Sequence, residues 1–192
     1  MKSILNHRLF FWLLLALPAI PMLLSDALAM DKLHPTGETS ARLLVVALAI
    51  TPLMLLTDRA RWVRWLKARR RYIGVAAFGY AALHLYYYAL DMETLGAILG
   101  EAAILSIWTG WLAFFAMLAM AATSNDAAMR ALKSGWKRLQ RLAYPAALLT
   151  LVHWIAVHDG LTSALLHAAP LAALETYRIY HLYTRRRISS HA

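Results

Sequence analysis

The fold is decided by residues 72–90, YIGVAAFGYAALHLYYYAL, a run of 19 residues with no charged side chain and one histidine, His84, in its second half. An α-helix rises 1.5 Å per residue, so about 20 apolar residues cross the hydrocarbon core of a bilayer. The run follows the basic segment 69–71 and ends before Asp91. It therefore predicts a membrane-spanning helix that starts at a positively charged face.

The same pattern recurs along the chain. The predicted spans are about 9–30, 39–57, 72–90, 102–122, 142–158 and 164–183. The first is longer than the apolar region of a typical signal peptide, so we interpret it as a retained span despite the cleavage-like Ala27-Leu28-Ala29. No polar linker is long enough to separate two domains. The sequence predicts a single all-α domain over residues 1–192, an integral membrane bundle of six helices.

The charges predict how this bundle is oriented. Hydrophobic residues make up 61% of the chain, and the net charge is +10. Seventeen of the 20 Lys and Arg residues lie before the first span, between the second and third, between the fourth and fifth, or after the sixth. Short basic loops stay in the cytoplasm, so both termini are predicted to be cytoplasmic. Because the bases form short clusters between apolar runs, a nucleic-acid partner is excluded.

Cofactor chemistry is limited by the absence of cysteine, which excludes iron–sulfur clusters and thiolate metal sites. Of eight histidines, His84 and His153 lie deep inside predicted spans. They follow Arg71 by 13 residues and Arg141 by 12, which places both roughly 18–20 Å from the cytoplasmic edge. Both spans run outward, so the two imidazoles are expected at one depth on parallel helices.

Two imidazoles arranged in this way suit the two axial positions of a haem iron. Small side chains on the same helix faces would leave room for a flat macrocycle: Gly74, Ala77 and Ala81 before His84, and Ala146 and Thr150 before His153. Arg42, near the outer end of its span, is a candidate partner for a haem propionate. His158 is a possible participant near the haem edge. The alternative is that both histidines pack against neighbouring helices or relay protons.

Several motifs carry a family resemblance over nearly the whole chain. The chain resembles the ferric-reductase-like transmembrane family, and more closely the haem-binding membrane subunits of periplasmic methionine-sulfoxide reductase systems. The matching stretches are His34-Pro-Thr-Gly37 with Arg42 and Ile50-Thr-Pro-Leu53, then Arg70-Arg71-Tyr72-Ile73-Gly74 leading to His84, and Gly135-Trp136 through Tyr144 leading to His153-Trp154.

This resemblance implies a multi-pass b-type haem protein of the bacterial inner membrane, an electron-transfer subunit rather than a complete enzyme. Its members take electrons from the quinone pool or a flavin reductase and pass them to a periplasmic molybdopterin enzyme that repairs oxidised methionine. Some are reported to carry FMN. On this resemblance His84 and His153 match the haem ligands, and Arg69, Arg70 and Arg71 are where a flavin phosphate would be attracted.

One departure from the family bears on the number of haems. The family commonly has a histidine 13 residues before the second ligand, where this chain has Gln140, and the matching position in the third span is Arg71. Neither replaces an imidazole on iron, so one outer haem is expected. Two alternatives stay open at this stage: a stand-alone transmembrane reductase of ferric iron or another acceptor, and a cofactor-free scaffold or transporter.

Overall fold

The computed structural model describes residues 7–158 and 161–190, with side chains for 7–157 and 161–184. Every regular element in these residues is helical, which confirms the all-α class. The elements are α1 (Arg8–Ala16), α2 (Ala19–Leu24), α3 (Ala29–Leu56), α4 (Arg61–Asp91), α5 (Leu95–Gly100), α6 (Leu105–Ala122), α7 (Asp126–Leu132), α8 (Ser134–Leu139), the 3-10 turn η2 (Gln140–Leu142), α9 (Ala143–His158) and α10 (Leu161–Ser190).

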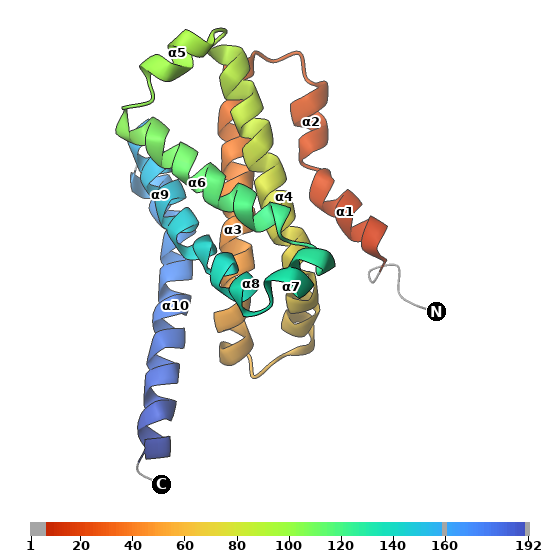
Figure 1. Cartoon of the computed structure of the whole chain (residues 1–192), viewed down its shortest axis with the longest axis vertical. Helices are drawn as coiled ribbons and strands as arrows, with labels where there is room; N and C mark the ends of the chain where they lie inside the picture. Colours follow the sequence, from red (N-terminus) through yellow and green to blue (C-terminus); the bar gives the residue numbers. More distant parts are fainter. Residues whose placement is uncertain (1–6, 159–160, 191–192) are drawn as a thin grey trace.

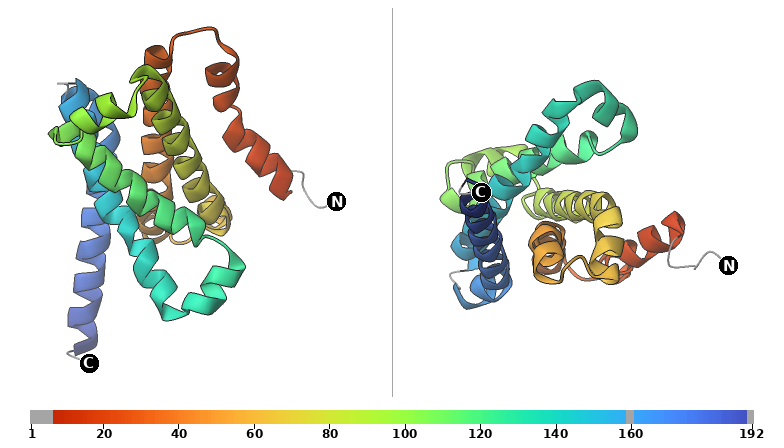
Figure 2. Two further views of the ribbon diagram at one scale, coloured as in Figure 1. Left: turned by 45° about the horizontal axis from the view of Figure 1, so that its top comes forward. Right: turned by 90° about the horizontal axis from the view of Figure 1, so that it is seen from below.

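The long helices run alternately up and down (Figure 1). Helices α4 and α9 rise towards the end of the molecule where α5 lies, and α3, α6 and α10 descend from it. The most extensive contacts join α3 to α4 and α6 to α9, so the centre consists of two antiparallel hairpins. Helix α10 covers the side away from α1 (Figures 1 and 2) and packs mainly on α3.

Three of the described helices, α3, α4 and α6, are long and apolar enough to cross a membrane. The family expectation of a membrane protein is therefore supported by the helices themselves, and the count of six spans stays a prediction. Helices α3, α4, α6 and α9 meet in a core of Leu44, Leu48, Ala77, Met117, Met120, Ala143 and Ala146. This core joins the two hairpins, since it takes side chains from both helices of each.

The predicted first span, 9–30, is two short helices instead of one. Helix α1 ends at Ala16 and α2 starts after Pro18. Proline has no N–H and its ring clashes with the carbonyl one turn back, so Pro18 interrupts the helix. The two pieces are held on α4 by tyrosines: the hydroxyl of Tyr80 donates to the Leu15 carbonyl (2.8 Å), and that of Tyr87 donates to the Met22 carbonyl (2.9 Å).

Two segments predicted as loops are largely helical. The outer segment 31–38 forms the first turns of α3, and α4 already begins at Arg61 within the basic segment 58–71. Charged residues indicate where a helix leaves the lipid. They do not end the helix, which can continue into water. Asp31, in the first turn of α3, also interacts favourably with the helix dipole. The chain turns at Asp58 and Arg59, both with positive φ.

Candidate metal centre

The rings of His84 on α4 and His153 on α9 face each other inside the bundle. Their centroids are 6.1 Å apart and their planes are nearly perpendicular, at 86°. Helices α4 and α9 run in the same direction (Figure 1), and the short distance between the centroids means that the rings meet at one level although they come from different hairpins. The structure therefore brings together the two histidines singled out from the sequence.

Each ring is oriented by a backbone carbonyl of the helix that precedes it in its hairpin. His84 Nδ1 lies 2.9 Å from the Leu33 oxygen on α3, with Thr36 Oγ1 at 3.5 Å. His153 Nδ1 lies 2.5 Å from the Ser106 oxygen on α6. A carbonyl oxygen only accepts, so each Nδ1 carries the hydrogen and donates it. The other ring nitrogen, Nε2, then keeps its lone pair, as in a metal-binding imidazole.

A glycine lies against each ring, one turn after the accepting carbonyl. A Cβ at Gly37 would be 3.0 Å from His84 Nδ1, and one at Gly110 would be 2.8 Å from His153 Nδ1. Both distances are far below ordinary van der Waals contact, which is about 3.5–4.0 Å. Each hairpin thus contains the same arrangement of three groups: a carbonyl, a glycine one turn later, and a histidine ring that contacts both.

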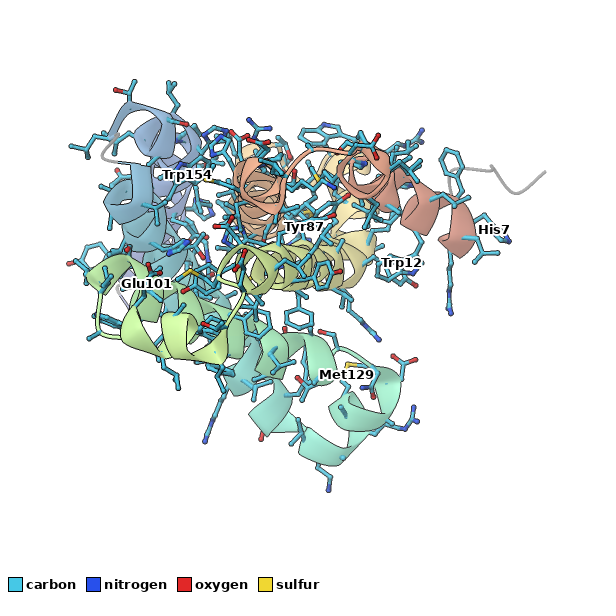
Figure 3. The ribbon with its side chains drawn as sticks, turned by 90° about the horizontal axis from the view of Figure 1, so that it is seen from above. His7, Trp12, Tyr87, Glu101, Met129 and Trp154 are labelled. Carbon is cyan, nitrogen blue, oxygen red and sulfur yellow. The ribbon has the colours of Figure 1, made fainter. Side chains whose placement is uncertain are left out.

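The two rings border a cavity of about 340 Å³ between α3, α4, α6 and α9. A small-molecule pocket of this kind is typically about 300–1,000 Å³ and mostly apolar. Its walls are mainly apolar. Five of its polar side chains come from the first turns of α3, the last turn of α4 and the residue after α5: His34, Glu38, Tyr88, Asp91 and Glu101. Viewed from that end (Figure 3), the lining residues Glu101 and Trp154 lie on the opposite side of the bundle from Trp12 and His7.

The predicted surroundings of the ligands divide into two groups. Ala81 and Thr150 line the cavity. Ala77 and Ala146 are fully buried in the core cluster instead, and Gly74, two turns further from His84 than Ala81, is not among the lining residues. The prediction assumed that the residues on one face of a helix contact the same neighbouring helix over three turns. Because the helices cross, the same face meets a different helix a turn or two further along.

Arg42 lies beside the cavity without lining it. Its guanidinium donates to Glu38 Oε1 (2.6 Å) and to His167 Nε2 (3.1 Å). Glu38 is itself a lining residue, so Arg42 reaches the cavity through its ion-pair partner. His34 was expected in an outer loop and lies on α3, 3.8 Å from Glu38. The side chain of His158 lies outside the described residues.

The basic residues proposed for a flavin phosphate contact three different partners. Arg69 donates to the Trp65 carbonyl and stacks on the Trp65 ring at 4.0 Å, Arg70 donates to Thr51, and Arg71 pairs with Asp126 at 2.6 Å. The structure does not bring them together around one point. The pKa of Asp126 is lowered, mainly because Arg71 donates a hydrogen bond to its carboxylate and attracts its negative charge.

Gln140 has a structural partner too. Its amide donates to the Met120 carbonyl (3.1 Å), near the end of α6, where backbone carbonyls have no helical partner. Trp136 donates to the Thr123 carbonyl (2.9 Å) at the same helix end. Gln140 therefore serves as part of a C-terminal cap for α6.

Sequence reasoning missed Gly37 and Gly110, and the carbonyls of Leu33 and Ser106. A signal was present at Gly110, which stands between two tryptophans near the start of an otherwise bulky apolar run. Such a glycine inside a helix lowers stability by about 1 kcal/mol relative to alanine, so it indicates a close approach. The partner of that approach is on another helix, and the sequence alone does not identify it.

Comparison with known proteins places this arrangement in a family. The profile of the "Ferric reductase like transmembrane component" family matches residues 36–151, which include Gly37, His84 and Gly110 and end two residues before His153. The chain belongs to this family. The match begins on α3 and ends on α9, so it covers most of both central hairpins.

Similar proteins of the family are described as heme-binding subunits MsrQ of protein-methionine-sulfoxide reductase. One from Xanthomonas campestris pv. campestris (strain 8004) is 36% identical over 174 residues, covering 86% of this chain and 78% of the relative. One from Bordetella pertussis (strain Tohama I) is 36% identical over 159 residues, covering 79% and 74%. No solved structure matches the chain significantly.

Proposed function

We propose that this chain is a membrane haem b electron-transfer subunit. It receives electrons from quinol, or from a cytoplasmic flavin or flavin reductase, and passes them across the bacterial inner membrane to a periplasmic molybdopterin enzyme that reduces methionine sulfoxide. The observation that carries the proposal is the pair of facing imidazoles, His84 and His153, each with Nδ1 on a carbonyl. The MsrQ relatives, whose name states heme binding and a methionine-sulfoxide reductase, support it.

The spacing of the rings fits an iron between them. An imidazole nitrogen binds a transition metal at about 2.0 Å, and the ring centre lies about 1 Å behind that nitrogen, so two axial imidazoles have centroids roughly 6 Å apart. The observed separation is 6.1 Å. The described residues contain no group of three or more metal-binding side chains. Two histidines alone suit an iron whose remaining four ligands belong to a macrocycle.

When bound, a haem supplies one-electron chemistry between ferric and ferrous iron. The chain holds the two ligands at fixed orientation, because a carbonyl binds one side of each ring and a glycine backbone lies against it. Ala81 and Thr150 line the cavity beside the ligands. Arg42 would share its charge between Glu38 and a haem propionate. Such fixed surroundings would keep both imidazoles in place with little rearrangement of the protein.

The proposed topology has six spans with both termini in the cytoplasm. In Figure 1 the α3–α4 turn with the start of α4, helices α7 and α8 and the C-terminal part of α10 lie away from the α5 end. These segments contain most of the basic residues, as expected for a cytoplasmic face. The α5 end, with Glu38, Asp91 and Glu101 near the cavity, would then face the periplasm, where the electrons leave.

We further propose a single haem. A second, inner haem would need ligands near Gln140 and Arg71, and these side chains are bound to Met120 and to Asp126. FMN remains a candidate for the inner half of the membrane. Its phosphate would have to displace the existing partners of Arg70 and Arg71, or bind them jointly.

A spectrum of the purified protein tests this function. We expect a sharp reduced haem b band with one iron per chain, loss of haem in His84→Ala and His153→Ala, and full haem in His167→Ala, a histidine outside the first cavity. Size-exclusion profiles check that the variants are folded. Protein without the band, or unchanged haem in both ligand variants, would favour the cofactor-free scaffold. An iron-to-protein ratio clearly above one would contradict the single haem.

A further inference from the structure

A second cavity, of about 250 Å³, lies between α3, α9 and α10. Each helix contributes side chains three or four positions apart, as one helix face does. These include Leu44 and Leu48 from α3, Ala147 and Leu151 from α9, and Ala168 and Leu171 from α10. The walls are almost entirely apolar, so the interior suits a lipid-soluble molecule and not a hydrated one.

This cavity shares a wall with the first. Ala41, Thr150 and Trp154 line both. Ala41 and Trp154 are buried, and Thr150 stands one turn before His153 on α9. A molecule in the second cavity is therefore separated from the histidine pair by single side chains and not by a whole helix.

One end of the second cavity is polar. Glu175 and Tyr144 line it, and Arg178 donates to Glu175 Oε2 at 2.9 Å and to the Tyr144 hydroxyl at 2.5 Å. The Tyr144 hydroxyl accepts in this contact, so its own hydrogen is the one it would donate to a ligand. Tyr144 is 39% exposed, so this end reaches the surface of the bundle. Tyr144 lies nine residues before His153 on α9. It is therefore about 14 Å from His153 along the helix, towards the proposed cytoplasmic face.

The opposite end offers no such group. His167 lines the cavity there, and both of its ring nitrogens are engaged: Nε2 accepts from Arg42 and Nδ1 lies 2.8 Å from the Ser163 carbonyl. Its ring also packs on Trp154, with centroids 5.1 Å apart. The polar head of a ligand would therefore lie at the Tyr144 end.

The chemistry at that end selects among lipid-soluble molecules. The Glu175 carboxylate accepts a hydrogen bond from a hydroxyl and repels a phosphate. The Tyr144 hydroxyl, polarised by Arg178, donates to a carbonyl or phenol oxygen. We infer that this cavity is the site where a membrane quinol is oxidised, with its ring at Tyr144 and Glu175 and its tail among the apolar walls. The inference rests on the proposed haem function and adds the place where electrons enter.

Oxidation of one quinol at this site releases two electrons and two hydroxyl protons and leaves a quinone. A haem held by His84 and His153 would take up these electrons one at a time and deliver each to the methionine-sulfoxide reductase before the next arrives. The protons leave through the Glu175 carboxylate to water at the proposed cytoplasmic face. No further oxidant or reductant is required.

The test uses the purified holoprotein in nanodiscs with decylubiquinol. Two readouts are taken: the rate of haem reduction after mixing, and the quinone that remains with the protein, measured by extraction. Ala168→Phe fills the cavity, and Ala169→Phe, at an exposed neighbouring position on α10, is the matched control. Tyr144→Phe keeps the ring and removes the hydroxyl, which is the proposed donor to the ligand and also the acceptor from Arg178. Reduction by dithionite, which needs no binding site, measures the haem content of every variant.

We expect at least tenfold slower reduction and loss of bound quinone in Ala168→Phe, about tenfold weaker quinone binding in Tyr144→Phe from one lost hydrogen bond, and wild-type behaviour in Ala169→Phe. Equal rates in the two alanine variants would overturn the inference, as would a wild-type haem that dithionite reduces and quinol does not, or a phospholipid extracted in place of quinone. Absence of haem would instead refute the proposed function.

Discussion

The glycine beside each histidine makes a sharp prediction, which we develop for Gly110→Ala. A Cβ at this position would lie 2.8 Å from His153 Nδ1 and 3.0 Å from Cε1. Normal contact requires about 3.5 Å, so the ring must retreat by roughly 0.5–0.7 Å. That movement carries Nδ1 against or away from the Ser106 carbonyl, which now holds it at 2.5 Å. The substitution therefore acts on the orientation of a proposed ligand.

The expected magnitude is set by two opposing effects. Alanine favours the α6 helix by about 1 kcal/mol relative to glycine. Overpacking in a filled interior costs about 1–3 kcal/mol. The helix propensity of alanine stabilises α6 and with it the fold of the whole protein. The cost of overpacking arises at the contact between residue 110 and the His153 ring. We therefore expect nearly unchanged thermal stability without haem, and haem affinity reduced about 5- to 150-fold.

The assay is haem titration of purified apoprotein, followed by the reduced spectrum and the ferric EPR signal, which responds to the orientation of the axial rings. Gly79→Ala is the matched control, because it lies on α4, is exposed, and its added Cβ would have nothing within 4 Å. The control should bind haem like the wild type. If Gly110→Ala also binds haem with wild-type affinity and an identical EPR signal, the glycine has no part in placing the ligand.

Three further predictions concern other contacts. Gly37→Ala should weaken haem binding less than the variant at 110, since its Cβ would lie 3.0 Å from the ring of His84; the same titration measures it. Gln140→Leu should lower the free energy of unfolding by about 0.5–1 kcal/mol and leave haem content unchanged, because one hydrogen bond to the end of α6 is lost while the Met120 carbonyl keeps the Ser124 hydroxyl at 2.7 Å; one denaturation curve and one spectrum check both, and a loss of haem would speak against the single-haem proposal. Asp126→Asn should lower the melting temperature slightly at pH 7, with the difference from wild type vanishing at low pH. Arg71 lowers the pKa of Asp126, so the ion pair stabilises the fold above the ordinary carboxylate pKa and stops doing so as the pH falls through the lowered value; a melting difference that persists in acid would contradict this.

The sequence was sufficient to predict the pairing of His84 with His153. Depth in a membrane can be counted from a charged edge at a fixed rise per residue, and this count holds even though α4 begins 11 residues before the predicted span. Which neighbours a helix face meets cannot be counted in the same way. Ala77 and Ala146 share the faces of the histidines and still belong to the core, because the crossing of helices depends on side-chain packing between hairpins.

The interruption at Pro18 shows another limit of hydropathy. Residues 9–30 are apolar enough for one span, and composition over a window does not respond to a single missing N–H. The proline was visible in the sequence, but its effect depends on where the pieces can pack. Here Tyr80 and Tyr87 on α4 bind backbone carbonyls of the N-terminal segment, and these contacts hold the broken segment in place.

The same arrangement of carbonyl, glycine and histidine occurs in both hairpins, which suggests why the candidate metal centre forms between them. Within each hairpin, the carbonyl and glycine of one helix orient the histidine of the other, so tautomer and ring direction are set by contacts inside the hairpin. Contacts between the hairpins are sparser than those within them, and the first cavity lies at that junction. A molecule bound in the first cavity would fill space that the side chains leave empty. Its binding free energy would stabilise the state in which the two hairpins are packed together. Removal of such a group should therefore loosen α4 from α9 while leaving α3–α4 and α6–α9 intact, since neither hairpin needs the group for its own hydrogen bonds.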